Sequence, residues 1–204
     1  MILSIDTFSE VLGLALLDRE NKVRFFVNYY KPKPFSESII TEIDRLFKEF
    51  EINKKDLKAI AVNKGPGAYT GLRIGITAAK IISYALSIDI YSYESLYTMA
   101  YRYKHFNGRI ISTIYAGKGE VYIRKFISNG KDLKPLTENL LIKKKELDKY
   151  IDKDALIIQK NLNDLLQNAK ALNTSLALDG LFLSLEKNLK ENPFTLEPVY
   201  LRKA

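Results

Sequence analysis

The first thirty residues consist of three apolar or alternating stretches separated by short polar turns. Met1–Asp6, Val11–Leu17 and Lys22–Tyr30 each have the length and the side-chain pattern of a β-strand. Residues 7–10 and 18–21 between them are mostly polar and have the length of turns. The pattern therefore predicts a three-stranded meander at the start of the chain.

Helical and strand patterns alternate over the next seventy residues. Apolar residues at 39, 40, 43, 46, 47 and 50 lie on one broad face of a helix, for which Ser36 is a suitable N-cap. The elements expected after this helix are a buried strand at Leu57–Val62, a helix at about Thr70–Leu86, a buried strand at Ile88–Tyr93 and a short helix ending near Tyr103. This order predicts a mixed sheet covered by helices, an α/β lobe over residues 1–105.

A second and smaller α/β lobe is expected over residues 106–204. Arg109–Tyr115 and Glu120–Ser128 have strand patterns and are joined by a glycine-containing turn. The helices expected after them are Lys143–Ile151, Asn161–Leu172 and Ser175–Lys190. The fold class predicted from the pattern is thus α/β, in two unequal lobes.

Composition limits the chemistry of the chain. Its 204 residues include no cysteine and one histidine, His105, so we expect no disulfide, no thiolate metal site, no cysteine nucleophile and no paired-imidazole metal site. No nucleophile–base set is evident either, so no catalytic residue is expected. No segment has the roughly 20 uninterrupted apolar residues of a membrane helix. The N-terminus has a strand pattern rather than that of a signal peptide. We therefore expect a cytoplasmic protein with no membrane contact.

The net charge of +8 is distributed unevenly. Residues 1–100 carry 13 Lys or Arg and 12 Asp or Glu, whereas residues 101–204 carry 19 and 12. A basic second half is typical of proteins that bind nucleic acid. A lysine-rich solvated surface explains the same numbers, so both interpretations remain open at this point.

Four glycines lie close together at positions 65, 67, 71 and 75. Their spacing matches neither common phosphate-binding glycine motif, and Pro66 lacks the N–H that such a loop uses. Gly71, Gly75 and Ala79 instead form a ridge of small residues along one face of the expected helix, with Thr70 as its cap. Such a ridge allows close packing, either within the lobe or against another subunit.

These residues resemble the TsaB (YeaZ) family, the bacterial partner in making threonylcarbamoyladenosine on tRNA. The segments that carry the resemblance are Ile2-Leu-Ser-Ile-Asp6-Thr7, Ser36-Glu37, Gly65–Lys80, Gly119-Glu120-Val121-Tyr122 and Glu197-Pro198-Val199-Tyr200-Leu201-Arg202. They span nearly the whole chain, and the glycine segment is the most specific. Phe8 and Phe35 depart from the family pattern, which has Ser and His there.

The resemblance implies a degenerate two-lobed fold of the actin, Hsp70 and sugar-kinase type. It also implies a scaffold without catalysis of its own, which binds and activates a TsaD-like catalytic subunit and is joined by a TsaE-like ATPase. The chain is then expected to form a homodimer when alone, to meet tRNA only indirectly through the complex, and to hold no tightly bound cofactor. ATP or ADP is expected only in the assembled complex. The alternative is a small ATPase or kinase of the same superfamily acting alone, and a tRNA-binding module is a third possibility.

The first hairpin lies where relatives of this fold hold phosphate and metal. Its polar residues here are Asp6, Thr7 and Ser9, and the turn has no glycine and carries the acidic Glu10. Because a carboxylate repels phosphate, we interpret the hairpin as a vestigial nucleotide site in which Asp6 caps the turn.

The same resemblance places a subunit interface on the two first-lobe helices. In similar proteins these helices pair with the catalytic subunit or with a second copy. The residues expected at this interface are Ile39, Ile40, Ile43, Gly71, Arg73, Ile74, Gly75, Thr77, Ala78 and Ala79.

Overall fold

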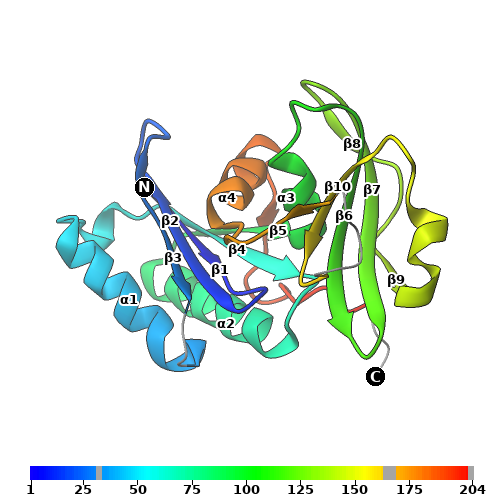
Figure 1. Ribbon diagram of the computed structural model, residues 1–204. Coiled ribbons are helices and arrows are strands. Elements are labelled where there is room, and N and C mark those ends of the chain that lie inside the picture. The colour runs from blue at the N-terminus through cyan, green and yellow to red at the C-terminus, as the bar shows by residue number, and fades with distance from the viewer. Residues whose placement is uncertain (31–33, 163–168, 202–204) are drawn as a thin grey trace. The chain divides into compact units, whose positions relative to one another are not determined.

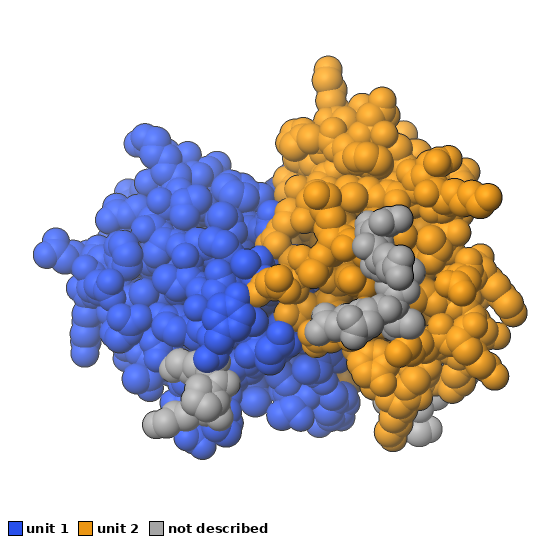
Figure 2. Space-filling view, viewed as in Figure 1, with its two compact units in different colours: residues 1–95, 174–199 blue, residues 96–173, 200–204 orange. Residues whose placement is uncertain are grey.

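The computed structural model describes residues 1–30, 34–162 and 169–201. They form two compact units, coloured separately in Figure 2. Unit 1 comprises residues 1–95 and 174–199, and unit 2 comprises residues 96–173 and 200–204. Within the described residues, each unit is built on one β-sheet of its own. The α/β class and the two-lobe organisation predicted from the sequence are therefore confirmed.

The sheet of unit 1 has the strand order β12-β5-β4-β1-β2-β3 (Figure 1). The first three strands form the predicted antiparallel meander, and β4 and β5 run parallel to β1. Its strands are β1 (Ile2–Asp6), β2 (Val11–Leu17), β3 (Val23–Tyr30), β4 (Ala59–Gly65), β5 (Asp89–Glu94) and β12 (Lys190–Glu191). This order brings the turn after β1 close to the end of β4, where a crossover helix begins.

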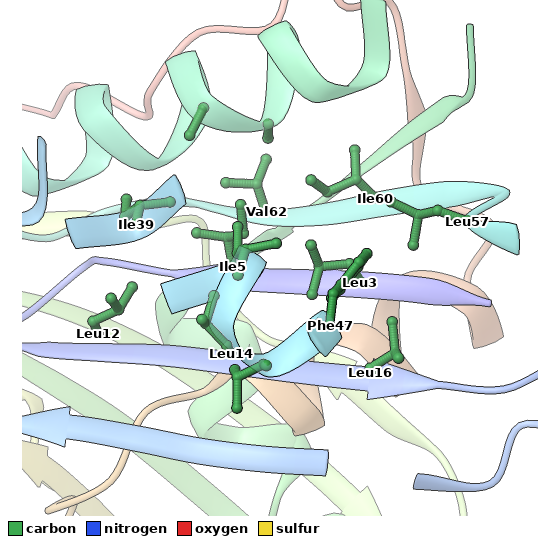
Figure 3. Packing of buried hydrophobic residues seen from close by; sticks show 14 of the residues in the cluster. Leu3, Ile5, Leu12, Leu14, Leu16, Ile39, Phe47, Leu57, Ile60 and Val62 are labelled. Carbon is green, nitrogen blue, oxygen red and sulfur yellow. The ribbon is translucent and has the colours of Figure 1, made fainter. Parts of the chain in front are cut away.

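Helices cover both faces of this sheet. α1 (Phe35–Glu49) and α2 (Tyr69–Leu86) lie on one face, and α4 (Ala177–Glu186) lies on the other (Figure 1). A one-turn 3₁₀ helix, η1 (Lys54–Asp56), precedes β4. In Figure 3, Leu3, Ile5 and Val62 of the sheet point into the same apolar core as Ile39 and Phe47 of α1. Burial of these alternating strand residues beneath two helices is the main source of stability in unit 1.

Both long helices begin without the predicted side-chain caps. The residues before α1 and α2 are Pro34 and Ala68, and neither makes a capping bond through its side chain. Ser36 and Thr70 lie within the first turns, so their assignment as caps is wrong. The start of α2 is instead tied down by the backbone, because the N–H of Ala68 donates to the carbonyl of Phe8 over 2.7 Å.

Unit 2 is built around a long hairpin whose two strands the sequence predicts. Its sheet has the order β11-β10-β6-β7-β8, and β9 pairs with β7. The elements are α3 (Ser95–Tyr101, beginning at the last residue of unit 1), β6 (Asn107–Gly117), β7 (Glu120–Asn129), β8 (Leu133–Pro135), β9 (Leu140–Lys143), the 3₁₀ helix η2 (Lys144–Tyr150), β10 (Leu156–Lys160) and β11 (Lys170–Ala171).

Three predicted helices of the second lobe differ from the structure. Lys143–Ile151 contains a 3₁₀ helix rather than an α-helix. Of Asn161–Leu172, residues 163–168 lie outside the described residues, and Lys170–Ala171 form a strand. Ser175–Lys190 ends as a helix at Glu186, because Asn188 has a positive φ of 48° and turns the chain into β12. The short strands β8 to β11 were not predicted.

The unit bounds also differ from the expected division after residue 105. The chain passes into unit 2 at Leu96, and residues 174–199 return to unit 1. The return has a physical reason, since α4 packs on the unit 1 sheet and β12 pairs with β5 at its edge. A division drawn at one point along the sequence cannot represent a segment that returns.

A partly buried ion pair holds β12 at this edge. Glu191 Oε1 lies 2.8 Å from Lys64 Nζ and accepts a hydrogen bond of 2.6 Å from Ser92 Oγ. Burial alone would raise the pKa of the Glu191 carboxyl, but the hydrogen bonds from Lys64 and Ser92 lower it below its ordinary value. The charged form of Glu191 is therefore the one that the fold stabilises.

Glu191→Gln should reduce the free energy of unfolding by about 1 kcal/mol at pH 7. Because the folded-state pKa of Glu191 lies below the unfolded-state value, its contribution is present above the unfolded pKa and is lost as the pH falls through the folded pKa. The difference between wild type and variant should therefore shrink on the acid side. Denaturant unfolding of wild type and variant at pH 7 and at pH 3 measures this difference. The control is Asp89→Asn, which removes the exposed ion pair between Asp89 and Lys190. An equal difference at both pH values would contradict this role.

Candidate partner-binding surface

The carboxyl group of Asp6 is buried and joined to three segments of unit 1. Its Oδ1 accepts hydrogen bonds from the N–H of Phe8, over 3.3 Å, and from Nδ2 of Asn63, over 2.9 Å. Its Oδ2 accepts from the N–H of Leu176, over 2.5 Å, at the start of α4. The hydrogen bond from Phe8 confirms that Asp6 caps the hairpin turn. The same carboxyl accepts from a free backbone N–H at the N-terminus of α4, where the helix dipole favours a negative charge.

The first turns of α2 close tightly over this hairpin. Thr7 Oγ1 donates to the carbonyl of Gly71 over 2.7 Å. A Cβ at Gly71 would lie 2.2 Å from the carbonyl oxygen of Thr7, and one at Gly75 would lie 2.2 Å from Thr7 Oγ1. Gly67 approaches the carbonyl of Phe8 in the same way, at 2.5 Å from an added Cβ. The glycines are therefore needed for packing of the helix against its own hairpin.

This packing corrects part of the expected interface. Gly71, Gly75 and Ala79 are buried inside unit 1, so the ridge of small residues does not lie open to a partner helix. Ile43 is likewise buried in the core, and Ile39 is 2% exposed. The sequence left open whether the ridge packs within the lobe or against another subunit. In the structure it packs within unit 1.

The polar side chains of the hairpin make hydrogen bonds within the fold. Both oxygens of Asp6 accept hydrogen bonds from the protein, and Thr7 is buried and bonded to α2. Ser9 is 6% exposed, and its hydroxyl accepts from the N–H of Val11 over 3.4 Å. Glu10 lies exposed beside the turn, where its charge opposes an anion.

A buried tyrosine of β5, Tyr93, makes hydrogen bonds to β1 next to Asp6. The Tyr93 hydroxyl lies 3.1 Å from Ser4 Oγ and donates to the carbonyl of Ile5, also over 3.1 Å. Complete burial, followed by the nearby charge of Asp6, raises the pKa of Tyr93 well above its usual value. The Tyr93 ring leaves no room for a side chain at Gly180 of α4, where a Cβ would lie 2.3 Å from it. Tyr93 therefore remains a neutral structural group.

The outer sides of α1 and α2 form a groove, named here the α1–α2 groove. Its floor and walls are mostly apolar. It is lined by Phe35, Ser36, Ile39, Ile40, Arg73, Ile74, Thr77, Ala78 and Ile81. Ile40 is 50% exposed and Ile81 is 59% exposed, which is unusual for isoleucine. Six of the ten predicted interface residues thus line the groove. Ile40, Arg73, Ile74 and Thr77 are exposed or half-buried there, whereas Ile39 and Ala78 are buried beneath them.

The apolar surface continues beyond the groove. A second depression at the end of α2 is lined by Lys80, Ile81, Tyr84, Ala85, Pro193 and Phe194. Tyr84 and Phe194 are 75% and 78% exposed. At the other end of the helix, the guanidinium of Arg73 lies over the ring of Tyr69 at 4.5 Å from its centre. Large exposed apolar surfaces of this kind are found where proteins interact with a partner.

Several of these residues were missed by sequence reasoning. Ile81 was detectable, because it follows Ile74, Thr77 and Ala78 at positions i+7, i+4 and i+3 on the same helix face. Phe194 was not, since it comes from a C-terminal segment that only the tertiary fold brings to α2.

Within the described part of the chain, no three His, Cys, Asp or Glu side chains are grouped closely enough to hold a metal ion. None of the helices described is long and apolar enough to cross a membrane. His105 is exposed, and its Nδ1 lies 3.2 Å from the carbonyl oxygen of Gly130.

A family model described as TsaD, tRNA N6-adenosine threonylcarbamoyltransferase, matches residues 31–190. This range covers most of the chain. The chain belongs to this family.

Within the family, the chain is similar to curated TsaB proteins. It is 39% identical over 121 residues to the tRNA threonylcarbamoyladenosine biosynthesis protein TsaB of Bacillus subtilis (strain 168). The matched region covers 59% of this chain and 52% of that protein. It is 30% identical over 123 residues to TsaB of Escherichia coli (strain K12), with 59% and 52% covered. The resemblance to the TsaB (YeaZ) family is thereby confirmed. The chain spans about half the length of the curated relatives it matches.

The fold of the TsaB (YeaZ) family is confirmed by a solved structure. A Pseudomonas aeruginosa protein, described as uncharacterized with similarity to peptidase YEAZ, superimposes with a TM-score of 0.80. The match covers 98% of this chain and 99% of that chain at 23% sequence identity. At this identity the comparison establishes the fold alone.

Gly71→Ala should lower the free energy of unfolding by roughly 1–3 kcal/mol, because the added Cβ collides with the backbone of Thr7. The better helix propensity of alanine offsets about 1 kcal/mol of that cost. Thr77→Ala, on the exposed side of α2, is the control and should change stability little. Thermal and denaturant unfolding of the two variants measures the difference, and a Gly71→Ala variant more stable than wild type would refute the packing described here.

Proposed function

We propose that this chain is a non-catalytic scaffold subunit in the formation of threonylcarbamoyladenosine on tRNA. In this proposal it binds and activates a TsaD-like catalytic subunit through the α1–α2 groove. The observation that carries the proposal is this exposed apolar groove, in a chain whose relatives are named for this biosynthesis. A monomer gains nothing from isoleucines at 50% and 59% exposure, whereas an interface buries them.

The polar rim of the groove supports an exchangeable protein contact. Arg73, Thr77 and Ser36 stand among the apolar side chains and supply donors around Ile40 and Ile74. Aliphatic anchors surrounded by such groups are the usual anatomy of a specific interface. In the absence of the catalytic subunit the same surface would pair two copies of the chain, which gives the homodimer.

The remaining partners follow from the family. A TsaE-like ATPase joins the proposed complex, tRNA is its substrate, and the cytoplasm is its location. In this scheme the chain itself contributes no chemistry. In support, no grouped metal ligands occur among the described residues, and Nδ1 of His105 lies 3.2 Å from the backbone carbonyl oxygen of Gly130. A reaction on tRNA then belongs to the catalytic subunit.

Ile40→Asp and Ile81→Asp test the groove. Each introduces a charge into the proposed buried centre of the interface, so affinity for the TsaD-like subunit of the same genome should fall by at least tenfold, or about 1.4 kcal/mol. Both positions are half exposed, so the fold should tolerate the change. Calorimetry of the mixed subunits measures the affinity of the heterodimer. Sedimentation of the chain alone measures the homodimer.

Leu136→Asp is the matched control, since Leu136 is 51% exposed and lies in unit 2. It should leave association unchanged. Full affinity in both groove variants, with melting temperatures equal to wild type, would refute the assignment of the interface. Transfer of the threonylcarbamoyl group to tRNA by the chain alone would refute the scaffold role itself.

We further propose that the β1–β2 hairpin no longer holds a nucleotide. Support comes from Asp6, whose two oxygens are occupied by protein donors, and from the buried Thr7 against Gly71. Titration of the chain with magnesium ATP should show no saturable binding at low micromolar concentration. Binding in that range that Asp6→Asn abolishes without unfolding would contradict the proposal and favour a small ATPase or kinase.

A further inference from the structure

The net positive charge of the protein lies in one unit. Of the 32 basic and 24 acidic residues in the sequence, unit 2 holds 17 and 8, which gives it a charge of +9 and leaves unit 1 at −1. An almost neutral unit and a strongly basic unit in one short chain indicate that the basic one meets a polyanion.

Four of the lysines of unit 2, Lys118, Lys143, Lys144 and Lys145, lie at one end of its long hairpin. The turn between β6 and β7 is tight, with positive φ at Gly117, Lys118 and Gly119. The side chain of Lys118 is exposed at this turn. The carbonyl of Gly119 accepts from the N–H of Lys144 over 2.8 Å, which fixes the start of η2 beside this turn. A surface pocket there is lined by Gly119, Lys143, Lys144, Lys145, Leu147 and Asp148.

Most of these ammonium groups are not used by the fold. Lys143 pairs with Glu120, at 2.6 Å. Lys118, Lys144 and Lys145 are exposed and make no ion pair with any residue in ranges 1–30, 34–162 and 169–201. Asp148 adds one carboxylate to the lining. The pocket therefore keeps a positive surplus that internal pairing does not cancel.

An exposed aromatic ring completes the arrangement. Tyr115, 38% exposed, lies at the end of β6, and its hydroxyl accepts from the N–H of Gly119 over 3.4 Å. A ring beside exposed ammonium groups suits a nucleic-acid strand, because the lysines can contact phosphates and the ring can stack on an unpaired base.

We propose that Tyr115, Lys118, Lys144 and Lys145 form a contact surface for the phosphate backbone of RNA. The choice of RNA rests on the proposed function, in which the substrate of the complex is tRNA. The surface adds a direct contact to the indirect role expected for tRNA. Lysines act as point charges without bidentate geometry, so this contact supplies affinity and position rather than base recognition.

The test measures tRNA binding by the purified 204-residue chain, using fluorescence anisotropy at salt concentrations between 50 and 200 mM. Lys144→Ala combined with Lys145→Ala removes two phosphate contacts. The slope of log affinity against log salt should become shallower by about 1.5, and affinity at the lowest salt should fall roughly tenfold. Tyr115→Ala should weaken binding with an unchanged slope, because stacking releases no counterions.

The matched control is Lys131→Ala combined with Lys134→Ala. These lysines are exposed and belong to the same unit. Lys131 lies in the β7–β8 turn and Lys134 in β8, at the opposite end of β7, so the same charge is removed elsewhere. Equal losses in both double variants would mean attraction by net charge alone and would overturn the site. Failure of the wild-type chain to bind tRNA at 50 mM salt, or preference for anionic vesicles or acidic peptides over tRNA, would also overturn it.

The two proposals fail separately. The lysine variants should bind the TsaD-like subunit as wild type does, and the groove variants should bind tRNA as wild type does. Loss of subunit binding in the lysine variants would assign this patch to the protein interface and refute the RNA contact.

Discussion

The carboxyl group of Asp6 joins three parts of unit 1 that are distant in sequence: the hairpin turn, the end of β4 and the start of α4. Loss of a buried acceptor of this kind leaves its donors unsatisfied, at roughly 1–3 kcal/mol for each. Asn63, one of the donors, also accepts from Ser95 Oγ and from the N–H of Gly65, so the network reaches the last residue of the unit. The hairpin can therefore take the tight contact with α2 only because Asp6 fixes its turn.

The two sides of α2 have different roles, and each limits the other. Where its inner side meets the hairpin it carries Gly71 and Gly75, which lets the helix approach Thr7 closely. Its outer side carries Ile74 and Ile81. A helix pressed so closely onto its sheet is held rigidly, so the apolar residues on its far side are presented at a fixed spacing to α1. A rigid surface loses little conformational freedom when it binds a partner.

The sequence predicted the first unit well, because its elements have strong periodicity and lie in chain order. It failed where contacts between distant segments decide the structure. The spacing of the glycine ridge is the same whether it packs on a hairpin or on a partner. Only the position of Thr7 in the folded structure shows that it packs on the hairpin. Phe194 and α4 reach unit 1 through a return of the chain that no local pattern records. The short strands β8 to β11 carry two to five residues each, too few for a periodic signal.

The two proposed contacts depend on different forces. An apolar groove on a nearly neutral unit associates by removing isoleucine side chains from water, a contribution that salt does not screen. A cluster of exposed lysines attracts a polyanion by counterion release, which falls steeply with salt and needs no buried area. The first kind of contact suits a subunit that stays bound through many reaction cycles. The second suits an RNA substrate, which must be released after each cycle, and its placement on a separate unit lets affinity for the substrate change without loosening the subunit interface.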